Sequence, residues 1–247
     1  MQLWLQILLV AVINFSSALL QASTGFGYAL VCMALMPLFL PMSTCSAISA
    51  VTVVAIGLQM SLSLRKDLQL KTIALPVLGC LTTINVGLWL LDTFDEMMLR
   101  IVLAGLLILV TGLFFFMRVR KIQLPDKWYT AIGAGLITGL STGMFNIVGP
   151  FLLVYYMNVC KSTLHMKASL EFSFLIAGLY STLMHLFVYN NITWQVAPHI
   201  LASVIASLVA GVIGLRLYRK CNKDKIALFI YILLPIMALM LIYNGLK

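Results

Sequence analysis

A succession of long apolar segments runs through the whole chain and constrains its fold more than any other feature. Counted against the roughly 20 residues that a helix needs to span a bilayer, about ten such segments occur. Helices are the expected element, because unpaired backbone groups in hydrocarbon are too costly for open sheets or coil. The sequence therefore predicts an all-α, polytopic membrane protein. The segments are centred on residues 3–22, 28–41, 44–64, 72–91, 97–117, 128–141, 146–159, 168–189, 195–215 and 226–245.

Composition supports a single membrane-embedded unit. Hydrophobic residues make up 62% of the chain and charged residues only 9%, which is more apolar than soluble domains tolerate. No stretch resembles a soluble domain or a low-complexity tail. The first segment lacks the basic start and the cleavage site of a signal peptide, so we expect it to be retained. The net charge of +9 is explained by basic loops that orient the chain, and no nucleic-acid partner is expected.

Basic residues predict how the chain crosses the membrane. Lys and Arg gather within residues 65–71, 118–127, 161–167 and 216–225. The positive-inside rule places these groups in the cytoplasm. The acidic loop 92–96 and the uncharged loop 189–195 then face outward. If the paired segments at the start of each half enter and leave on one side, all other spans alternate. This predicts a multi-pass protein of the plasma membrane with both termini outside.

Three of the segments are too short to be full spans. Segments 28–41, 128–141 and 146–159 contain about 14 residues each, a length that suits half-membrane helices. Each half of the chain therefore reads as a re-entrant or broken-helix hairpin followed by three transmembrane helices. An odd number of crossings in each copy inverts the second copy relative to the first.

A weak internal similarity supports the same division. Ser23, Thr24 and Gly25 recur as Ser141, Thr142 and Gly143, and Ala50 recurs as Ala168 at the same offset. Inverted repeats with interrupted helices at corresponding positions are typical of secondary transporters. We therefore predict a first membrane repeat over residues 1–120 and a second, inverted repeat over 121–247, together forming one membrane domain.

The two breaks are the candidate substrate site. Both carry Ser, Thr and Gly, residues that are typical of helix starts. Two helix N-termini that meet near the membrane midplane would bind an anion through unpaired N–H groups and the helix dipole. The alternative is that these small residues only allow helices to pack tightly. The candidate substrate-binding residues are Ser23, Thr24, Gly25, Gly27, Ser141, Thr142, Gly143 and Asn146.

One acidic residue, Glu171, lies inside a long apolar segment. Ionisable groups at membrane depth are costly, and they usually pair or take part in transport. Lys167 lies four residues earlier, on the same helix face. Two interpretations stay open: a structural ion pair with Lys167, or a carboxyl group that titrates and couples proton movement to the substrate.

Metal, cofactor and enzyme motifs do not emerge from the sequence. The three histidines lack spacing such as HExxH, and the cysteines form no CxxC pair, so no metal site, cofactor or disulfide framework is expected. Neither paired intramembrane aspartates nor a nucleophile elbow is present, and we expect no enzyme activity. The five cysteines are Cys32, Cys45, Cys80, Cys160 and Cys221.

Several of these features together resemble a known family. They are the duplicated Gly-containing hairpin, the prolines that follow it, the small-residue spans that begin near Ala50 and Ala168, and the basic loop between the halves. On them the chain resembles the sulfite exporter TauE/SafE family, also called TSUP, over nearly its whole length. The prolines are Pro37 and Pro41 in the first copy and Pro150 in the second.

The resemblance implies transport of sulfur-containing anions such as sulfite and organosulfonates. It also implies that glycines of the hairpins line the substrate path, and the matching positions are Gly25, Gly27 and Gly143. Where family members often carry a run of glycines, this chain has Phe26, Met144 and Phe145. These bulky side chains are expected to narrow or reshape the pocket.

The combined expectation is a secondary transporter, or permease, for a small and sulfur-containing anion, which works by alternating access at two facing hairpin tips. A carrier for a carboxylate or another anion stays open as an alternative, and so does an anion channel. The expected partners are a small anionic substrate, protons and the lipid bilayer, and the sequence favours no oligomeric state.

Overall fold

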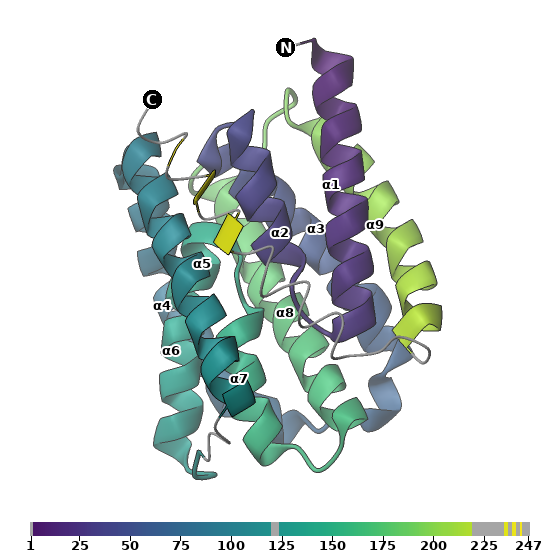
Figure 1. The fold of residues 1–247 in the computed structure, drawn as a ribbon, viewed down its shortest axis with the longest axis vertical. Helices are drawn as coiled ribbons and strands as arrows, with labels where there is room; N and C mark the ends of the chain where they lie inside the picture. The colour runs from purple at the N-terminus through teal and green to yellow at the C-terminus, as the bar shows by residue number, and fades with distance from the viewer. Residues whose placement is uncertain (1, 120–123, 219–234, 237–238, 241–242, 244–247) are drawn as a thin grey trace.

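The computed structural model describes residues 2–119, 124–218, 235–236, 239–240 and 243. All regular elements in this part of the chain are helices (Figure 1). Six of the described helices are long and apolar enough to cross a membrane. The prediction of an all-α, polytopic membrane protein is confirmed. The tenth apolar segment, 226–245, lies mostly outside the described residues.

The first half of the chain contains five α-helices. At about 1.5 Å per residue, the 22 residues of α1 extend about 33 Å, enough for a full span, whereas the 8 residues of α2 extend only about 12 Å. A 3-10 turn at Met36–Leu38 ends α2, because Pro37 cannot continue an α-helix. The helices are α1 (Leu3–Thr24), α2 (Tyr28–Leu35), α3 (Met42–Ser63), α4 (Leu70–Thr93) and α5 (Glu96–Val119).

The described part of the second half repeats this order of lengths. Helix α7 is short, with 11 residues, as predicted. Helix α6 is longer than the predicted segment 128–141, because it continues through Ser141–Phe145 and has 18 residues. The helices are α6 (Trp128–Phe145), α7 (Gly149–Val159), α8 (Thr163–Phe187) and α9 (Ala197–Tyr218).

The helices of the two halves pack against each other in a reciprocal pattern. Helix α1 lies along α9, α4 lies along α6, and α3 lies along α8 (Figure 1). Figure 1 also shows α1 starting at the upper end of the bundle and α6 at the lower end. Two copies related by a two-fold axis in the membrane plane would pair in this way. The inverted repeat stays a prediction, which this packing supports.

Glycines bring α4 and α6 into very close contact. A Cβ atom placed on Gly139 would lie 2.1 Å from the Cys80 carbonyl oxygen, and one on Gly135 would lie 2.2 Å from the Pro76 carbonyl oxygen. The Thr83 hydroxyl donates a hydrogen bond of 2.7 Å across the interface to the Leu136 carbonyl. Small residues at every fourth position allow such approach of membrane helices.

Gly139→Ala is therefore expected to destabilise the bundle. The added methyl group must push α4 and α6 apart, at a cost of about 2–3 kcal/mol. Gly133 on the same helix is the matched control, since a Cβ there would meet nothing within 4 Å. Thermal unfolding in detergent should show a lowered midpoint for Gly139→Ala and an unchanged or slightly raised one for Gly133→Ala. Equal midpoints for the two variants would contradict this packing.

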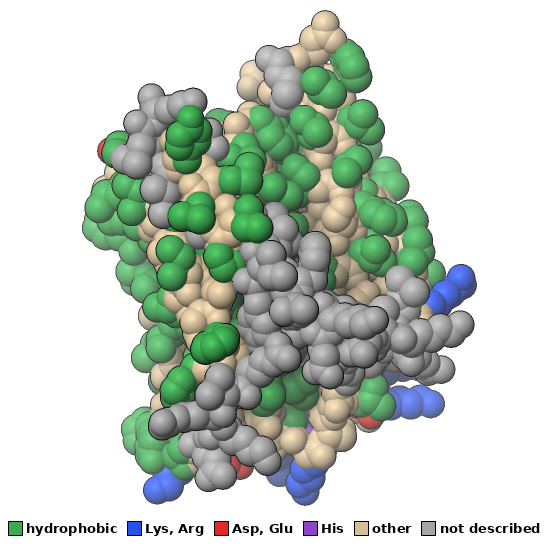
Figure 2. Space-filling view, viewed as in Figure 1, with side chains coloured by type: hydrophobic (Ala, Val, Ile, Leu, Met, Phe, Trp, Pro, Cys, Tyr) green, Lys and Arg blue, Asp and Glu red, His purple; other side chains and the backbone are tan. Residues whose placement is uncertain are grey.

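The molecule has a charged end and apolar sides. Figure 2 shows Lys and Arg side chains gathered toward the lower end, with hydrophobic side chains covering the visible sides above. Large apolar side chains such as Trp89 and Phe187 are more than half exposed, which fits a surface that faces lipid. The N-terminus lies at the opposite, upper end (Figure 1). Assignment of the charged end to the cytoplasm stays a prediction.

Candidate functional site

Two breaks in the helices are formed by residues that tolerate a left-handed backbone. Gly25 and Gly27, between α1 and α2, have φ values of 93° and 104°, which residues with a Cβ atom rarely adopt. Asn146, between α6 and α7, has a φ of 53°, and Asn is one of the few non-Gly residues that accept this conformation. Each break therefore reverses the chain at a residue suited to it.

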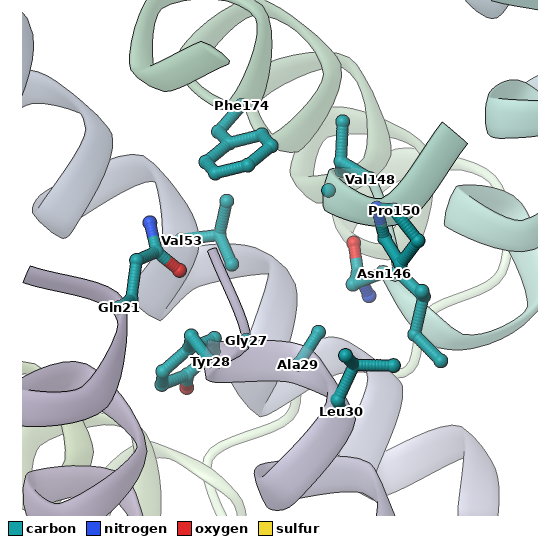
Figure 3. Close-up of a pocket in the computed structure, with 12 residues that line it drawn as sticks. Gln21, Gly27, Tyr28, Ala29, Leu30, Val53, Asn146, Val148, Pro150 and Phe174 are labelled. Carbon is teal, nitrogen blue, oxygen red and sulfur yellow. The ribbon is translucent and has the colours of Figure 1, made fainter. Parts of the chain in front are cut away.

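The two breaks lie face to face. A Cβ atom on Gly149, the first residue of α7, would lie 3.1 Å from the Cβ of Phe26 in the first break. A cavity with about 280 Å³ of empty space, part of which is open to solvent, lies between them. The starts of α2 and α7 line it together with Gln21 and Asn146, and Val53 and Phe174 contribute from α3 and α8 (Figure 3).

Both short helices start at this cavity. The lining includes residues 27–30 at the start of α2 and residues 148–150 at the start of α7. The first N–H groups of a helix have no acceptor within it, and the helix dipole adds about half a positive charge there. Pro150 supplies no N–H group. The remaining N–H groups make the cavity favourable for a small anion.

Only two of the eight predicted substrate-binding residues, Gly27 and Asn146, line the cavity. Ser23 and Thr24 lie in the last turn of α1, where their hydroxyls donate hydrogen bonds to the carbonyls of Leu19 and Leu20, at 2.7 and 2.8 Å. The expectation that these two residues start a helix is wrong, because they complete one.

The equivalent pair in the second break behaves similarly. Ser141 and Thr142 lie within α6, and the Thr142 hydroxyl donates to the Thr138 carbonyl at 2.7 Å. The helix-start interpretation is therefore wrong for them as well. The Ser141 hydroxyl lies 2.7 Å from the carbonyl oxygen of Ile147, across the break, and so holds the break in shape.

The remaining glycines take separate roles. Gly143 faces α4, and a Cβ there would lie 2.2 Å from the carbonyl oxygen of Ile84. This position agrees with the alternative in which small residues allow helices to pack tightly. Gly25 faces Lys167, whose Cγ would lie 3.6 Å from an added Cβ.

The bulky residues expected to narrow the pocket do not line it. The cavity lining includes neither Met144 nor Phe145. The ring of Phe26 packs on Phe114 of α5, with the ring centroids 5.1 Å apart. The departure from a glycine run therefore shapes the packing around the break rather than the cavity wall.

Lys167 and Glu171 both dock onto the end of α1. Both side chains are buried, with exposed fractions of 2% and 0%. Lys167 Nζ donates a hydrogen bond of 2.6 Å to the Ala22 carbonyl, and a cation is favourable at a helix C-terminus. Glu171 Oε2 accepts a hydrogen bond of 3.0 Å from Gln21 Nε2. Because Gln21 also lines the cavity, it connects the buried carboxylate to the candidate site.

A second polar chain leads from the cavity toward the α8–α9 connection. Asn146 Nδ2 donates to the Ser46 carbonyl oxygen at 2.8 Å and lies 3.0 Å from Ser46 Oγ. Ser46 Oγ lies 3.2 Å from His185 Nε2, and His185 Nδ1 lies 3.0 Å from Asn191 Nδ2. In the part of the chain that the structure describes, no three His, Cys, Asp or Glu side chains gather as a metal site would require.

Comparison with known proteins agrees with this architecture. The family model described as sulfite exporter TauE/SafE matches residues 9–241, which confirms the resemblance inferred from the sequence. Neither the curated proteins nor the solved structures contain a match to the chain.

Proposed function

The chain belongs to the sulfite exporter TauE/SafE family, a family of membrane transporters and not of enzymes, and from this premise we propose that it carries a small sulfur-containing anion, such as sulfite or an organosulfonate, by alternating access at the two facing breaks. The observation that supports this most is the meeting of the starts of α2 and α7 at one cavity.

The anion binds between elements that belong to different halves of the chain. Gln21 and residues 27–30 contribute one wall of the cavity and residues 146–150 the other. Rocking of one half against the other therefore opens the cavity to one side of the membrane at a time. Helices α3 and α8 also meet across the two halves, where Gly57 lets them approach, since a Cβ there would lie 3.1 Å from the Leu175 backbone.

In this proposal the charged end of the bundle faces the cytoplasm of a plasma-membrane protein, and both termini face outward. Glu171 carries the coupled proton. Its carboxylate reaches the cavity through the hydrogen bond from Gln21, so a change in its protonation alters the donor and acceptor pattern that the substrate meets. The alternative role, a structural ion pair with Lys167, is separated from coupling by the variants discussed below.

Flux measurements in proteoliposomes test the proposed function. Radiolabelled sulfite, thiosulfate and a simple sulfonate are offered with and without a pH gradient, beside empty liposomes. We expect saturable flux of at least one anion that responds to the gradient. Absence of flux from folded protein would overturn the sulfur-anion proposal and direct the same assay to carboxylates. Conductance far above carrier turnover would indicate a channel instead.

A further inference from the structure

We propose that the cavity takes its oxyanion in a form that still carries one proton, so that the ligand donates an O–H hydrogen bond as well as accepting hydrogen bonds. This inference rests on the proposed function and narrows its substrate class. The O–H form of hydrogensulfite satisfies the requirement, whereas fully ionised sulfite and alkyl sulfonates do not. The inference follows from the orientation of two buried carboxamide side chains.

The orientation of the Asn146 carboxamide is set by its surroundings. Its nitrogen lies 2.8 Å from the backbone carbonyl oxygen of Ser46, a group that only accepts hydrogen bonds. The Asn146 oxygen must therefore point the other way. It has no hydrogen-bond partner among the described residues, although the side chain is only 1% exposed. Figure 3 shows this oxygen on the side of the residue that faces Phe174 across the cavity.

Gln21 presents the same group from the opposite wall. Its nitrogen donates to Glu171 Oε2 at 3.0 Å, and an ionised carboxylate likewise only accepts. The Gln21 oxygen is turned toward the cavity (Figure 3), and the side chain is 2% exposed. On each side of the cavity, the carbonyl oxygen of one buried carboxamide, Gln21 or Asn146, thus faces the ligand.

These two oxygens change what the cavity accepts. The N–H groups at the starts of α2 and α7 bind the charged oxygens of an anion. The carboxamide oxygens, in contrast, repel the lone pairs of an ion that has no hydrogen to offer, and they stay without a hydrogen-bond donor when such an ion binds. A site built around a hydrogen bond to a ligand hydroxyl rejects analogues that lack the hydroxyl.

The pH dependence of transport, measured for two substrates, shows whether the required proton is on the ligand or on the protein. Titratable side chains lie on the helices that form the cavity, and their protonation would give every substrate the same pH profile. Profiles that follow each substrate's own ionisation must reflect the proton on the ligand. Sulfite and selenite suit this comparison, because hydrogenselenite ionises at a higher pH than hydrogensulfite. Tyr28 lines the cavity, and Glu171 bonds to the lining residue Gln21. The other titratable groups on the packed helices are Lys167, which bonds to Ala22, His185, which bonds to Ser46, Cys32 of α2 and Tyr156 of α7.

The experiment measures initial uptake into proteoliposomes at equal pH on both sides, with the uptake of empty liposomes subtracted. Above the ionisation of each substrate, uptake at constant total concentration should fall about tenfold per pH unit, and the selenite profile should lie at higher pH. Methanesulfonate, which has no O–H group, should be taken up at least about 100-fold less efficiently. Coinciding profiles, or efficient uptake of methanesulfonate, would overturn the inference while leaving the proposed function intact. No uptake of any of the anions would overturn both.

Asn146→Gly tests the carboxamide directly. Glycine tolerates the left-handed backbone of this position, with φ of 53°, and removes the oxygen. Discrimination between hydrogensulfite and methanesulfonate should fall at least about tenfold, because one acceptor is lost. Asn190→Gly is the matched control, since Asn190 has the same φ of 53° but lies in the α8–α9 connection. Unchanged discrimination in a folded Asn146→Gly variant would contradict the role of this oxygen.

Discussion

Glu171→Gln is expected to abolish accumulation driven by a pH gradient while exchange of labelled for unlabelled substrate continues. The amide keeps the shape of the side chain and the hydrogen bond with Gln21, but it cannot take up a proton at any physiological pH. Parallel measurements of exchange and of gradient-driven accumulation in the same proteoliposomes separate the two effects.

Asp92→Asn is the control for Glu171→Gln, because Asp92 is an exposed carboxyl group near the end of α4. It should leave both measurements unchanged. Full gradient-driven accumulation by Glu171→Gln would show that another group carries the proton. Loss of folded protein from the membrane would show instead that Glu171 is needed for folding, as the ion-pair interpretation requires.

Lys167→Met should remove most of the folded protein. Lys167 and Glu171 interact electrostatically within a fully buried region, and Lys167 also satisfies the Ala22 carbonyl at the end of α1. Without Lys167 the buried Glu171 carboxylate has no cation beside it, at a cost of about 3–5 kcal/mol. In Glu171→Gln, by contrast, the Lys167 cation keeps its hydrogen bond to the Ala22 carbonyl at the C-terminus of α1. Protein level in the membrane and the thermal midpoint in detergent measure this loss.

The double variant Lys167→Met/Glu171→Gln should recover much of the stability that Lys167→Met loses, since no buried charge remains. Lys161→Met is the control, because Lys161 is exposed in the α7–α8 connection. This variant should have the same thermal midpoint as the unmodified protein. A double variant that is as unstable as the single one would mean that the hydrogen bond to Ala22, rather than the charge pair, is what the fold requires.

Hydropathy was sufficient to predict an all-α, polytopic membrane protein. The apolar segments and the short second arm of each hairpin follow from segment length, which is a local property. The second break lies at Asn146, later than predicted, because α6 continues through Phe145. The roles of Ser23 and Thr24 could not be predicted in this way. A hydroxyl beside a glycine serves equally as a helix start or as a helix end that bonds to the preceding turn.

Contacts between distant parts of the chain account for the rest. Gln21 and Glu171 are 150 residues apart and Asn146 and Ser46 are 100 apart, so no spacing rule connects them. The packing role of Gly143 could, by contrast, be predicted from the sequence. It continues the every-fourth-residue series of Gly135 and Gly139, which is a packing signal in membrane helices.

Protection of a cavity residue by substrate tests directly whether the anion binds between the two breaks. Ala29 lies in the first turn of α2 and lines the cavity. Ala29→Cys, made in a background without native cysteines that still transports, is labelled with a thiol reagent in membranes with and without sulfite. Gln195→Cys, on the exposed α8–α9 connection, is the control. Sulfite should slow labelling at position 29 several-fold and leave position 195 unaffected. Equal labelling rates at position 29 under saturating transport conditions would contradict a substrate site between the two breaks.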